Sequence, residues 1–328
     1  MTQSTFLVTG ALGCLGAWTV KNLLEQNANV VAFDLGTDVY RWRALMDDAT
    51  IARAKLVHGD ISDYNTIERV VLENGITHVI HLAALQVPFC KANPVLGAQV
   101  NVVGTVNVFQ VAAKLRAQIQ RVVYASSAAV YGPPQLYSQI PVPVEGPLAP
   151  TTLYGSYKQD NENCARVFFN DNGVESVGIR PFVIYGVGRD RGMTSQPTKA
   201  MLAAVLGRTW NIPHSGHFNF QLADDTAKTF IHCATAEYHG ARVFNLNGIV
   251  ASVPEIIDAI ERVMPEARGK ISYADAPLPF PDALDSNTLH ETFGSMPETP
   301  LGEGIAATME HFRALVQQKR IDVENALA

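Results

Sequence analysis

The sequence predicts an α/β protein built on a doubly wound parallel sheet, with a smaller C-terminal lobe. Short apolar runs alternate with helical runs through the first half of its 328 residues, and a glycine-rich stretch follows the first apolar run. Apolar strands that alternate with helices are typical of a parallel sheet covered on both faces. With 47% hydrophobic residues, the chain supplies the core that such a fold needs.

Seven short runs have the apolar character of buried strands: residues 6–9, 30–33, 55–58, 78–82, 121–125, 174–180 and 242–246. Helical runs stand between several of them, at residues 64–73, 95–115 and 154–169. From about Gly188 onward prolines recur and divide the chain into shorter pieces. We therefore expect a smaller lobe over the carboxyl ends of the strands, and only a frayed helix end after about Lys319.

Three glycines, Gly10, Gly13 and Gly16, follow the first predicted strand, and Cys14 and Leu15 stand between the last two. A sharp turn from a strand into a helix needs residues without a Cβ atom, and the N–H groups at the helix start attract phosphate. The stretch therefore predicts the phosphate-binding turn of a Rossmann-like sheet. On its own, it would also fit a tight turn that binds no ligand.

Asp34 ends the second predicted strand. It stands about 20 residues after the glycines, at the offset where an acidic residue binds an adenosine ribose. Its carboxylate would repel a 2′-phosphate, which favours NAD over NADP. Arg41 and Arg43 follow closely, however, and could serve such a phosphate.

The ends of the third and fourth predicted strands carry further cofactor candidates. Asp60 can accept a hydrogen bond from an adenine amino group while Ile61 lies against the ring, although a helix cap is the alternative role for Asp60. Leu82, Ala83 and Ala84 follow the fourth strand, and small residues there allow a cofactor to lie over the backbone. Close helix packing would explain these small residues equally well.

Tyr154 and Lys158 are the residues that we expect to carry the chemistry. Their spacing of four places both side chains on one face of a helix. A nearby ammonium favours a phenolate, so Lys158 would bring the tyrosine toward a useful acid/base range, and it can also bond the nicotinamide ribose. Ser126 and Ser127 end the fifth strand, where a serine would orient the reacting oxygen toward Tyr154. An exposed helical pair and a loop-capping hydroxyl are the alternatives.

Together these residues resemble the extended short-chain dehydrogenase/reductase superfamily, and within it the NAD-dependent epimerase/dehydratase branch. The motifs occur in that family's order over nearly the whole chain: Thr-Gly-x-x-Gly-x-x-Gly at 9–16, Asp34, Asp60, His-Leu-Ala-Ala at 81–84, Asn-Val-Val-Gly-Thr at 101–105, Ser-Ser-x-x-Val-Tyr-Gly at 126–132, Tyr-x-x-x-Lys at 154–158, Arg-Pro at 180–181 and Tyr-Gly at 185–186. The resemblance implies that Ser127 is the catalytic serine, Tyr154 the acid/base and Lys158 its partner. It also implies cofactor contacts at Ala83, Asn101, Ala125 and Pro181.

Departures from the family pattern bear on the substrate. Ala128 and Ala129 stand where the 4,6-dehydratases carry the Asp and Glu that eliminate water, which disfavours that activity. Gln86 replaces a lysine that is usual in sugar-nucleotide epimerases, and the stretch 217–219 holds no arginine to clamp a substrate diphosphate. We therefore expect a substrate other than a nucleotide sugar, with candidate contacts at Gln86, Ser127, Phe182, Arg189 and His214.

The sequence thus predicts an NAD-dependent oxidoreductase that transfers hydride at a secondary alcohol or ketone of a small polyhydroxy substrate, such as a sugar, sugar acid or hydroxy acid. Residues 1–187, with contributions from about 221–250, would bind NAD, and residues 188–328 would form mainly the substrate-binding lobe. A nucleotide-sugar 4-epimerase with tightly bound NAD is the first alternative, because arginines elsewhere could supply an anion site: Arg189, Arg191 and Arg208. A non-catalytic NAD-binding regulator is the second.

Composition and spacing argue against other classes of partner. The net charge of −6 and the lack of a basic cluster disfavour nucleic acid, and no apolar run is long enough to span a bilayer. Residues 1–4 leave no room for a signal peptide before the first strand, and four scattered cysteines fit reduced thiols in a cytoplasmic protein. The histidine pairs at 78/81 and 214/217 lack the arrangement of metal ligands, so we expect no metal. By resemblance, the helical runs 95–115 and 154–169 would pair with a second copy in a homodimer.

Overall fold

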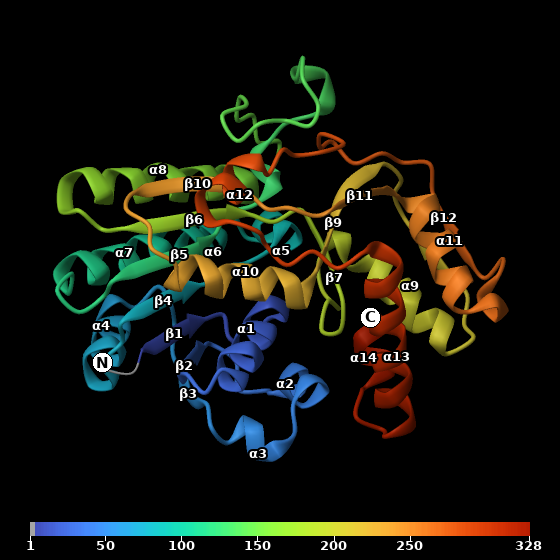
Figure 1. The fold of residues 1–328 in the computed structure, drawn as a ribbon, viewed down its shortest axis with the longest axis horizontal. Helices are drawn as coiled ribbons and strands as arrows, with labels where there is room; N and C mark the ends of the chain where they lie inside the picture. The colour runs from blue at the N-terminus through green and yellow to red at the C-terminus, as the bar shows by residue number, and fades with distance from the viewer. Residues whose placement is uncertain (1–3) are drawn as a thin grey trace.

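A seven-stranded parallel sheet organises the computed structural model, in the order β10-β6-β5-β4-β1-β2-β3 (Figure 1). The strands are β1 (Thr5–Thr9), β2 (Asn29–Asp34), β3 (Lys55–His58), β4 (His78–His81), β5 (Arg121–Ala125), β6 (Ser176–Arg180) and β10 (Ala241–Asn245). Each begins and ends within two residues of its predicted run. The structure describes residues 4–328, so the expectation about a signal peptide falls partly on residues outside the described part.

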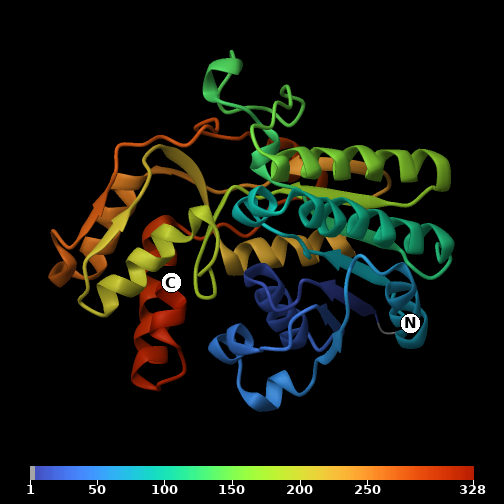
Figure 2. The ribbon, with the colours of Figure 1, turned by 180° about the vertical axis from the view of Figure 1, so that it is seen from behind.

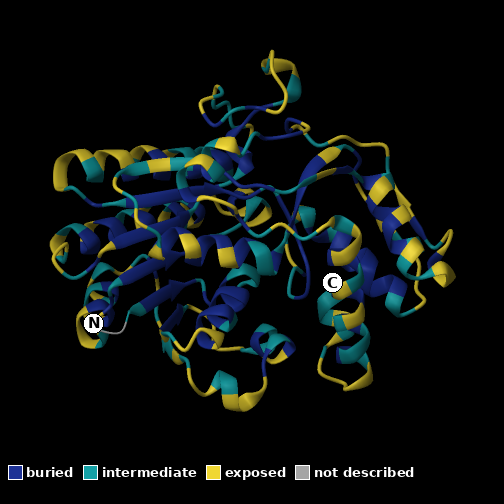
Figure 3. Ribbon diagram, in the orientation of Figure 1, coloured by how far each residue is buried: buried dark blue, intermediate teal, exposed yellow. Residues whose placement is uncertain are grey.

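Helices cover both faces of this sheet, as the sequence predicts. One face carries α1 (Cys14–Glu25), α10 (Ala223–Thr235) and α12 (Asn287–Phe293), and the other carries α4 (Tyr64–Asn74), α7 (Gly104–Lys114) and α8 (Leu153–Asn172), as the two opposite views in Figures 1 and 2 show. Successive side chains of β1 point to opposite faces of the sheet. Phe6 and Val8 pack toward α1 on one face, and Leu7 packs toward α4 on the other. Figure 3 shows the central strands between them as a buried layer.

The predicted helix at 95–115 is three joined pieces: α6 (Pro94–Ala98), a π-helical turn η1 (Gln99–Val103) and α7. By length and composition the stretch Pro94–Lys114 could cross a membrane, which differs from the expectation that no run is long enough. Half of its most apolar window is buried inside the molecule, however, where α7 packs on α4 and α8. Core packing therefore accounts for the buried half of its apolar side chains.

The smaller lobe contains two further sheets. β7 (Val183–Tyr185), β9 (His217–Leu222) and β11 (Ile249–Ser252) form one, and β8 (Trp210–Ile212) pairs with β12 (Ile271–Tyr273) in the other. Their core is shared with α9 (Gln196–Val205), α11 (Val253–Val263) and α13 (Leu301–Gln317). The chain crosses between the lobes more than once, because β7 precedes residue 187 while α10 and β10 return to the large sheet.

The remaining short helices lie in connections: α2 (Tyr40–Leu45), α3 (Asp48–Ile51), α5 (Val87–Ala92) and α14 (Val323–Leu327). The expectation of a frayed end after Lys319 is wrong, since α14 forms there. Asp322 caps it by accepting from Asn325 N, and Arg191 donates to the Asn325 side chain at 2.6 Å.

Candidate active site

The glycine turn between β1 and α1 is as tight as its sequence requires. Gly10 has a φ of +68°, and a Cβ atom there would lie 2.7 Å from Ala83 N. A Cβ atom at Gly16 would lie 2.1 Å from Gly10 O, so the helix could not approach the strand as it does. The first-turn N–H groups of α1 stand beside the cavity described next and offer a site for a diphosphate.

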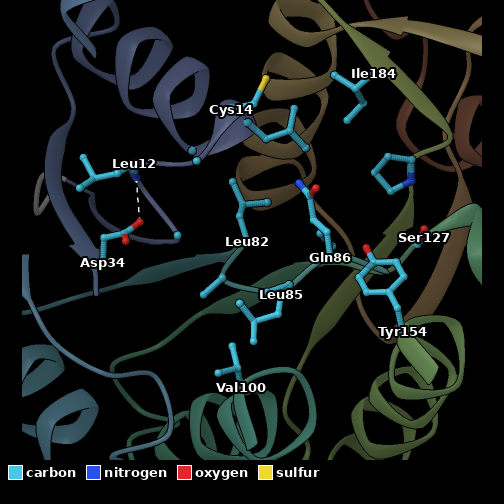
Figure 4. Close-up of a pocket in the computed structure, with 18 of the residues that line it drawn as sticks. Leu12, Cys14, Asp34, Leu82, Leu85, Gln86, Val100, Ser127, Tyr154 and Ile184 are labelled. Carbon is cyan, nitrogen blue, oxygen red and sulfur yellow. Dashed lines mark hydrogen bonds between the residues drawn. The ribbon is translucent and has the colours of Figure 1, made fainter. Parts of the chain in front are cut away.

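A cavity of about 670 Å³ opens at the carboxyl ends of the strands, around the point between β1 and β4 where the strand order reverses (Figure 4). It brings together most of the predicted site residues. These are Gly10, Gly13, Cys14, Leu15, Gly16, Asp34, Asp60, Ile61, Leu82, Ala83, Ala84, Gln86, Ala125, Ser127, Tyr154, Lys158, Pro181, Phe182 and Arg189.

Asp34 is fixed at the rim of this cavity by the backbone of the glycine turn. Its Oδ2 accepts from Leu12 N and its Oδ1 from Gly36 N, both at 2.9 Å (the former dashed in Figure 4). Each oxygen keeps a lone pair for a ribose hydroxyl. Arg41 donates instead to Leu12 O at 2.8 Å and pairs with Asp190 at 2.5 Å, so its guanidinium is already engaged. The residues present therefore fit NAD, with no free Arg41 to meet a 2′-phosphate.

At the adenine end of the cavity, Asp60 is free of the helix-capping role that was its alternative. Asp63, rather than Asp60, caps α4 by accepting from Asn65 N and Thr66 N. Asp60 accepts from Ser62 N at 2.8 Å through one oxygen, which leaves the other oxygen for an amino group.

Tyr154 and Ser127 face each other on one wall of the cavity (Figure 4). Ser127 is near enough to oppose the rise in the pKa of Tyr154, and its Oγ accepts from Ala129 N at 3.1 Å. Lys158 lies one helical turn after the tyrosine on α8. Its Nζ donates to Ala125 O at 2.7 Å and stands 5.6 Å from the centre of the Tyr154 ring. The three predicted catalytic side chains thus share one site.

The electrostatics of the wall differ from the sequence-based expectation. Burial raises the pKa of Tyr154, and the opposing contributions come from the Ser127 hydrogen bond and the charge of Arg189. Burial also lowers the pKa of Lys158 to about 8. The lysine ammonium donates to the Ala125 carbonyl and approaches the ring of the tyrosine.

The two neighbouring serines have separate partners. Ser126 is 2% exposed and donates to Glu162, which receives two hydrogen bonds from Arg180 at 2.7 and 2.8 Å. This buried cluster ties β5 and β6 to α8. Ser127 lines the cavity with Tyr154, and its catalytic role stays a prediction.

Two predicted residues lie away from the cavity wall. Asn101 is fully buried on η1 and holds the backbone of Leu85, accepting from its N at 2.7 Å and donating to its O at 2.9 Å. His214 lies outside the group of described residues that line the cavity, with its ring 5.7 Å from that of Phe218. Within residues 4–328, no group of three His, Cys, Asp or Glu side chains could hold a metal.

The substrate end of the cavity includes residues that carry no recognisable motif. Ile184 lies in β7, Met193 and Thr194 lie in the connection between β7 and α9, and Phe280 comes from the segment before α12. Phe280 reaches the cavity by stacking edge-on against Phe182, with ring centres 5.9 Å apart. Such a contact between remote segments leaves no local signal in the sequence.

Comparison with known proteins agrees with this site. The model of the NAD dependent epimerase/dehydratase family matches residues 6–246. The chain is 31% identical over 326 residues to a UDP-glucose 4-epimerase of Mycolicibacterium smegmatis, covering 94% of this chain and 98% of that protein. It is 27% identical to a UDP-glucose 4-epimerase of Azospirillum brasilense, covering 95% and 92%.

Solved structures show the same fold. The UDP-glucose 4-epimerase of Thermotoga maritima with UDP-glucose has a TM-score of 0.82 at 20% identity, covering 95% of this chain and 99% of that one. The L-threonine dehydrogenase of Clostridium difficile has a TM-score of 0.83 at 19% identity, covering 96% and 99%. MoeE5 in complex with UDP-glucuronic acid and NAD has a TM-score of 0.79 at 25% identity, covering 95% and 99%.

The chain therefore belongs to the NAD-dependent epimerase/dehydratase family of the extended short-chain dehydrogenase/reductase superfamily. It is an NAD-dependent enzyme, and the predicted fold, enzyme class and cofactor are confirmed. The similar sequences include epimerases, and the similar structures include dehydrogenases as well. Which reaction this enzyme catalyses must therefore be inferred from the residues of the site.

Proposed function

We propose that this enzyme oxidises a secondary alcohol of a small polyhydroxy compound with net conversion of NAD to NADH. The observation that carries the proposal is that Ser127, Tyr154 and Lys158 all line the cavity that holds the glycine turn, with Lys158 Nζ 5.6 Å from the centre of the Tyr154 ring. Bound NAD supplies the hydride acceptor. The glycine turn, Asp34 and Asp60 would hold it, with the reacting carbon of the substrate facing Tyr154.

The three side chains would divide the proton chemistry among them. Tyr154 takes the proton of the substrate hydroxyl, and Ser127 holds that oxygen by a hydrogen bond. Lys158 adds positive charge near the phenolate that must form, a contribution that is fully present only below its pKa of about 8. Because burial raises the pKa of Tyr154, its phenolate would form beside a charged Lys158 only if the positive charge of the bound nicotinamide lowered the pKa of the tyrosine.

The strand that would meet a nucleotide diphosphate supports a substrate without one. Phe218 on β9 is buried, and Asn219 is occupied with the backbone of Leu284, accepting from its N at 2.9 Å. Residues 217–219 thus bring no cation to the cavity. A diphosphate at this strand would lack the charge-assisted, often bidentate contact that an arginine in residues 217–219 would give, and only Arg189 on the opposite segment could replace it.

A nucleotide-sugar 4-epimerase is the second candidate, favoured by the 31% identity to such an enzyme over 94% of this chain. In that reading NAD stays bound and is regenerated in each cycle. A non-catalytic NAD-binding regulator is the third candidate, and the presence of Ser127, Tyr154 and Lys158 together argues against it.

The test is the absorbance of NADH with purified enzyme, NAD and a panel of free sugars, sugar acids and hydroxy acids beside UDP-sugars. Accumulation of NADH with a free compound would support a net dehydrogenase. Interconversion of UDP-sugars on chromatography, without NADH, would put the epimerase first.

A further inference from the structure

Two side chains at the substrate end of the cavity each have a polar atom without a hydrogen-bond partner. Arg189 Nε and Gln86 Oε1 are buried and have no hydrogen-bond partner among the described residues. Arg189 makes one hydrogen bond with its Nη2, to Thr194 Oγ1 at 3.0 Å. Native proteins leave few buried polar atoms unpaired, so each such atom needs an explanation.

The neighbouring acid does not neutralise this arginine. Asp190 accepts from Arg41 at 2.5 and 3.2 Å and from the Tyr40 hydroxyl at 2.7 Å, so its oxygens are already engaged. Burial lowers the pKa of Arg189, as expected for a guanidinium held in the wall without a carboxylate partner. A buried charge of this kind is unfavourable until an anion pairs with it.

The two unpaired groups lie together, close to the acid/base. A Cβ atom at Gly192 would stand 2.1 Å from Gln86 Oε1 and 3.5 Å from Arg189 Nη2, so the bare backbone there leaves room for both side chains. Arg189 interacts electrostatically with Tyr154. Figure 4 shows Gln86 reaching into the middle of the cavity between Cys14 and Tyr154.

There is also space for a ligand beside them. Arg189 and Gln86 line the main cavity and a second, smaller one of about 170 Å³. A substrate held at Tyr154 could therefore extend past both side chains without displacing the backbone.

We propose that Arg189 and Gln86 form a subsite for the carboxylate and an adjacent hydroxyl of a small sugar acid. Arg189 would pair with the carboxylate, Gln86 Oε1 would accept from a second hydroxyl, and Ser127 with Tyr154 would hold the hydroxyl that reacts. This inference rests on the proposed function and narrows its substrate class. In the reaction the alcohol carbon gives a hydride to NAD, its hydroxyl gives a proton to Tyr154, and the carboxylate is unchanged.

The diphosphate of the cofactor is the other anion within reach, because Arg189 also lies near Cys14 in the glycine turn. The first turn of α1 already offers N–H groups to that diphosphate. The guanidinium, by contrast, acts on the acid/base Tyr154 and has no acidic partner, which favours the substrate as its partner.

The decisive variant is Arg189→Met, with Arg208→Met as its control. Arg208 is an exposed arginine that pairs with Glu324 away from the cavity. The assay compares kcat/KM for a set of sugar acids with that for the neutral polyol of the same carbon skeleton, and calorimetry measures NAD affinity. Thermal unfolding of each variant shows that it is folded.

We expect the unaltered enzyme to prefer acids over matched polyols. Arg189→Met should raise KM for the acids by about 10- to 100-fold, the loss expected for a hydrogen bond to a charged group, and remove the preference. NAD affinity should stay unchanged, as should all parameters of Arg208→Met. A milder rise in KM is expected for Arg189→Lys, which keeps the positive charge but loses the paired N–H groups that bind a carboxylate through both its oxygens.

Each contrary result points elsewhere. Loss of NAD affinity in Arg189→Met would assign the arginine to the cofactor diphosphate and overturn the subsite. Equal use of acids and polyols would also overturn it, while the proposed dehydrogenase would stand. If no compound yields NADH, calorimetry of sugar acids with the NAD-loaded protein separates the two ideas: Arg189-dependent binding would support the subsite and refute only the redox reaction, and no binding would refute both.

Discussion

Tyr154 illustrates how the environment of a single residue sets its chemistry. Replacing it with Phe removes one hydroxyl and keeps the ring, so the cavity should keep its shape. We expect kcat to fall by about 10²- to 10⁴-fold, the usual contribution of general acid–base catalysis, with NAD affinity unchanged. Steady-state kinetics and calorimetry measure the two.

Tyr157→Phe is the matched control for that experiment. Tyr157 lies on the same helix, but its hydroxyl donates to Pro94 O at 3.0 Å, away from the acid/base. Activity should survive there. Full activity in Tyr154→Phe would instead refute the assignment of the acid/base.

His81 links a single buried ring to the acid stability of the enzyme. It lies between Thr9 and Thr105, and burial, aided by the charge of Lys158, lowers its pKa from 6.5 to about 3. Between these two values the unfolded chain binds a proton that the folded protein does not. Stability must therefore fall as the pH falls through this window, by up to about 1.4 kcal/mol per pH unit from this residue.

Urea unfolding at pH 7 and pH 4.5 measures that effect. The free energy of unfolding should be lower at pH 4.5 by about 2–3 kcal/mol on account of His81, and more in total because His78 also has a lowered pKa. His81→Gln should lose the His81 share, whereas a Gln at the exposed His58 should leave the slope as it was. An unchanged slope in His81→Gln would contradict the argument.

For single residues of the site, the sequence predicts a role that depends on a local motif. It misses a role that depends on a partner far away in the chain. The glycine turn, Asp34 and Tyr154 stand in fixed positions after strands, and the cavity brings them together. Arg41 was a candidate for a phosphate, but Asp190, 149 residues away, takes its guanidinium. No spacing rule contains that pairing.

Among the elements, the turn from β1 into α1 is the most demanding in geometry. Gly16→Ala would place a Cβ atom 2.1 Å from Gly10 O, so the helix must move away from the strand. We expect NAD affinity to collapse and the free energy of unfolding to fall by about 1–3 kcal/mol, as for other overpacked sites. Calorimetry and urea unfolding measure these.

Gly302→Ala is the matched control, because a Cβ atom there meets nothing within 4 Å. Residue 302 lies in the first turn of α13, so alanine should be neutral or stabilising by up to about 1 kcal/mol. Normal NAD affinity in Gly16→Ala would show that the turn tolerates a displaced helix.

The central strands of the large sheet were predictable because each is a short apolar run buried on both faces, whereas β3 and β10 at the edges are only partly buried. The small sheets were not, because β7 and β8 are three residues long and take their partners from distant segments. The helix α14 depends on a polar cap and on Arg191, contacts that hydrophobic periodicity does not register.

For the whole molecule, the division into an NAD-binding part at 1–187 and a substrate-binding part at 188–328 remains a proposal. Arg41 joins the two by bonding Leu12 O in the glycine turn and Gly188 O beyond β7. All four cysteines, each within the described residues, are free thiols.

A homodimer is the last prediction, and the helix pair α7 and α8 is where it should form. Large apolar side chains are exposed on these helices and on the segments that lead into α7, including Val95 on α6 at 68%, Val103 on η1 at 46% and Val167 on α8 at 50%. Exposed apolar side chains that gather into one patch often mark a protein–protein interaction site. Two copies could bury it by packing these helices together.

Light scattering after size exclusion measures the mass directly. We expect twice the chain mass for the unaltered protein and a single chain for the double variant Val103→Glu with Val167→Glu, because burying unpaired carboxylates costs more than the contact returns. Val250→Glu makes the same change at an exposed valine on β11 and should leave the dimer intact. If the unaltered protein is monomeric at micromolar concentration, the exposed helix side chains do not form a self-interface, and the site must be complete within one chain.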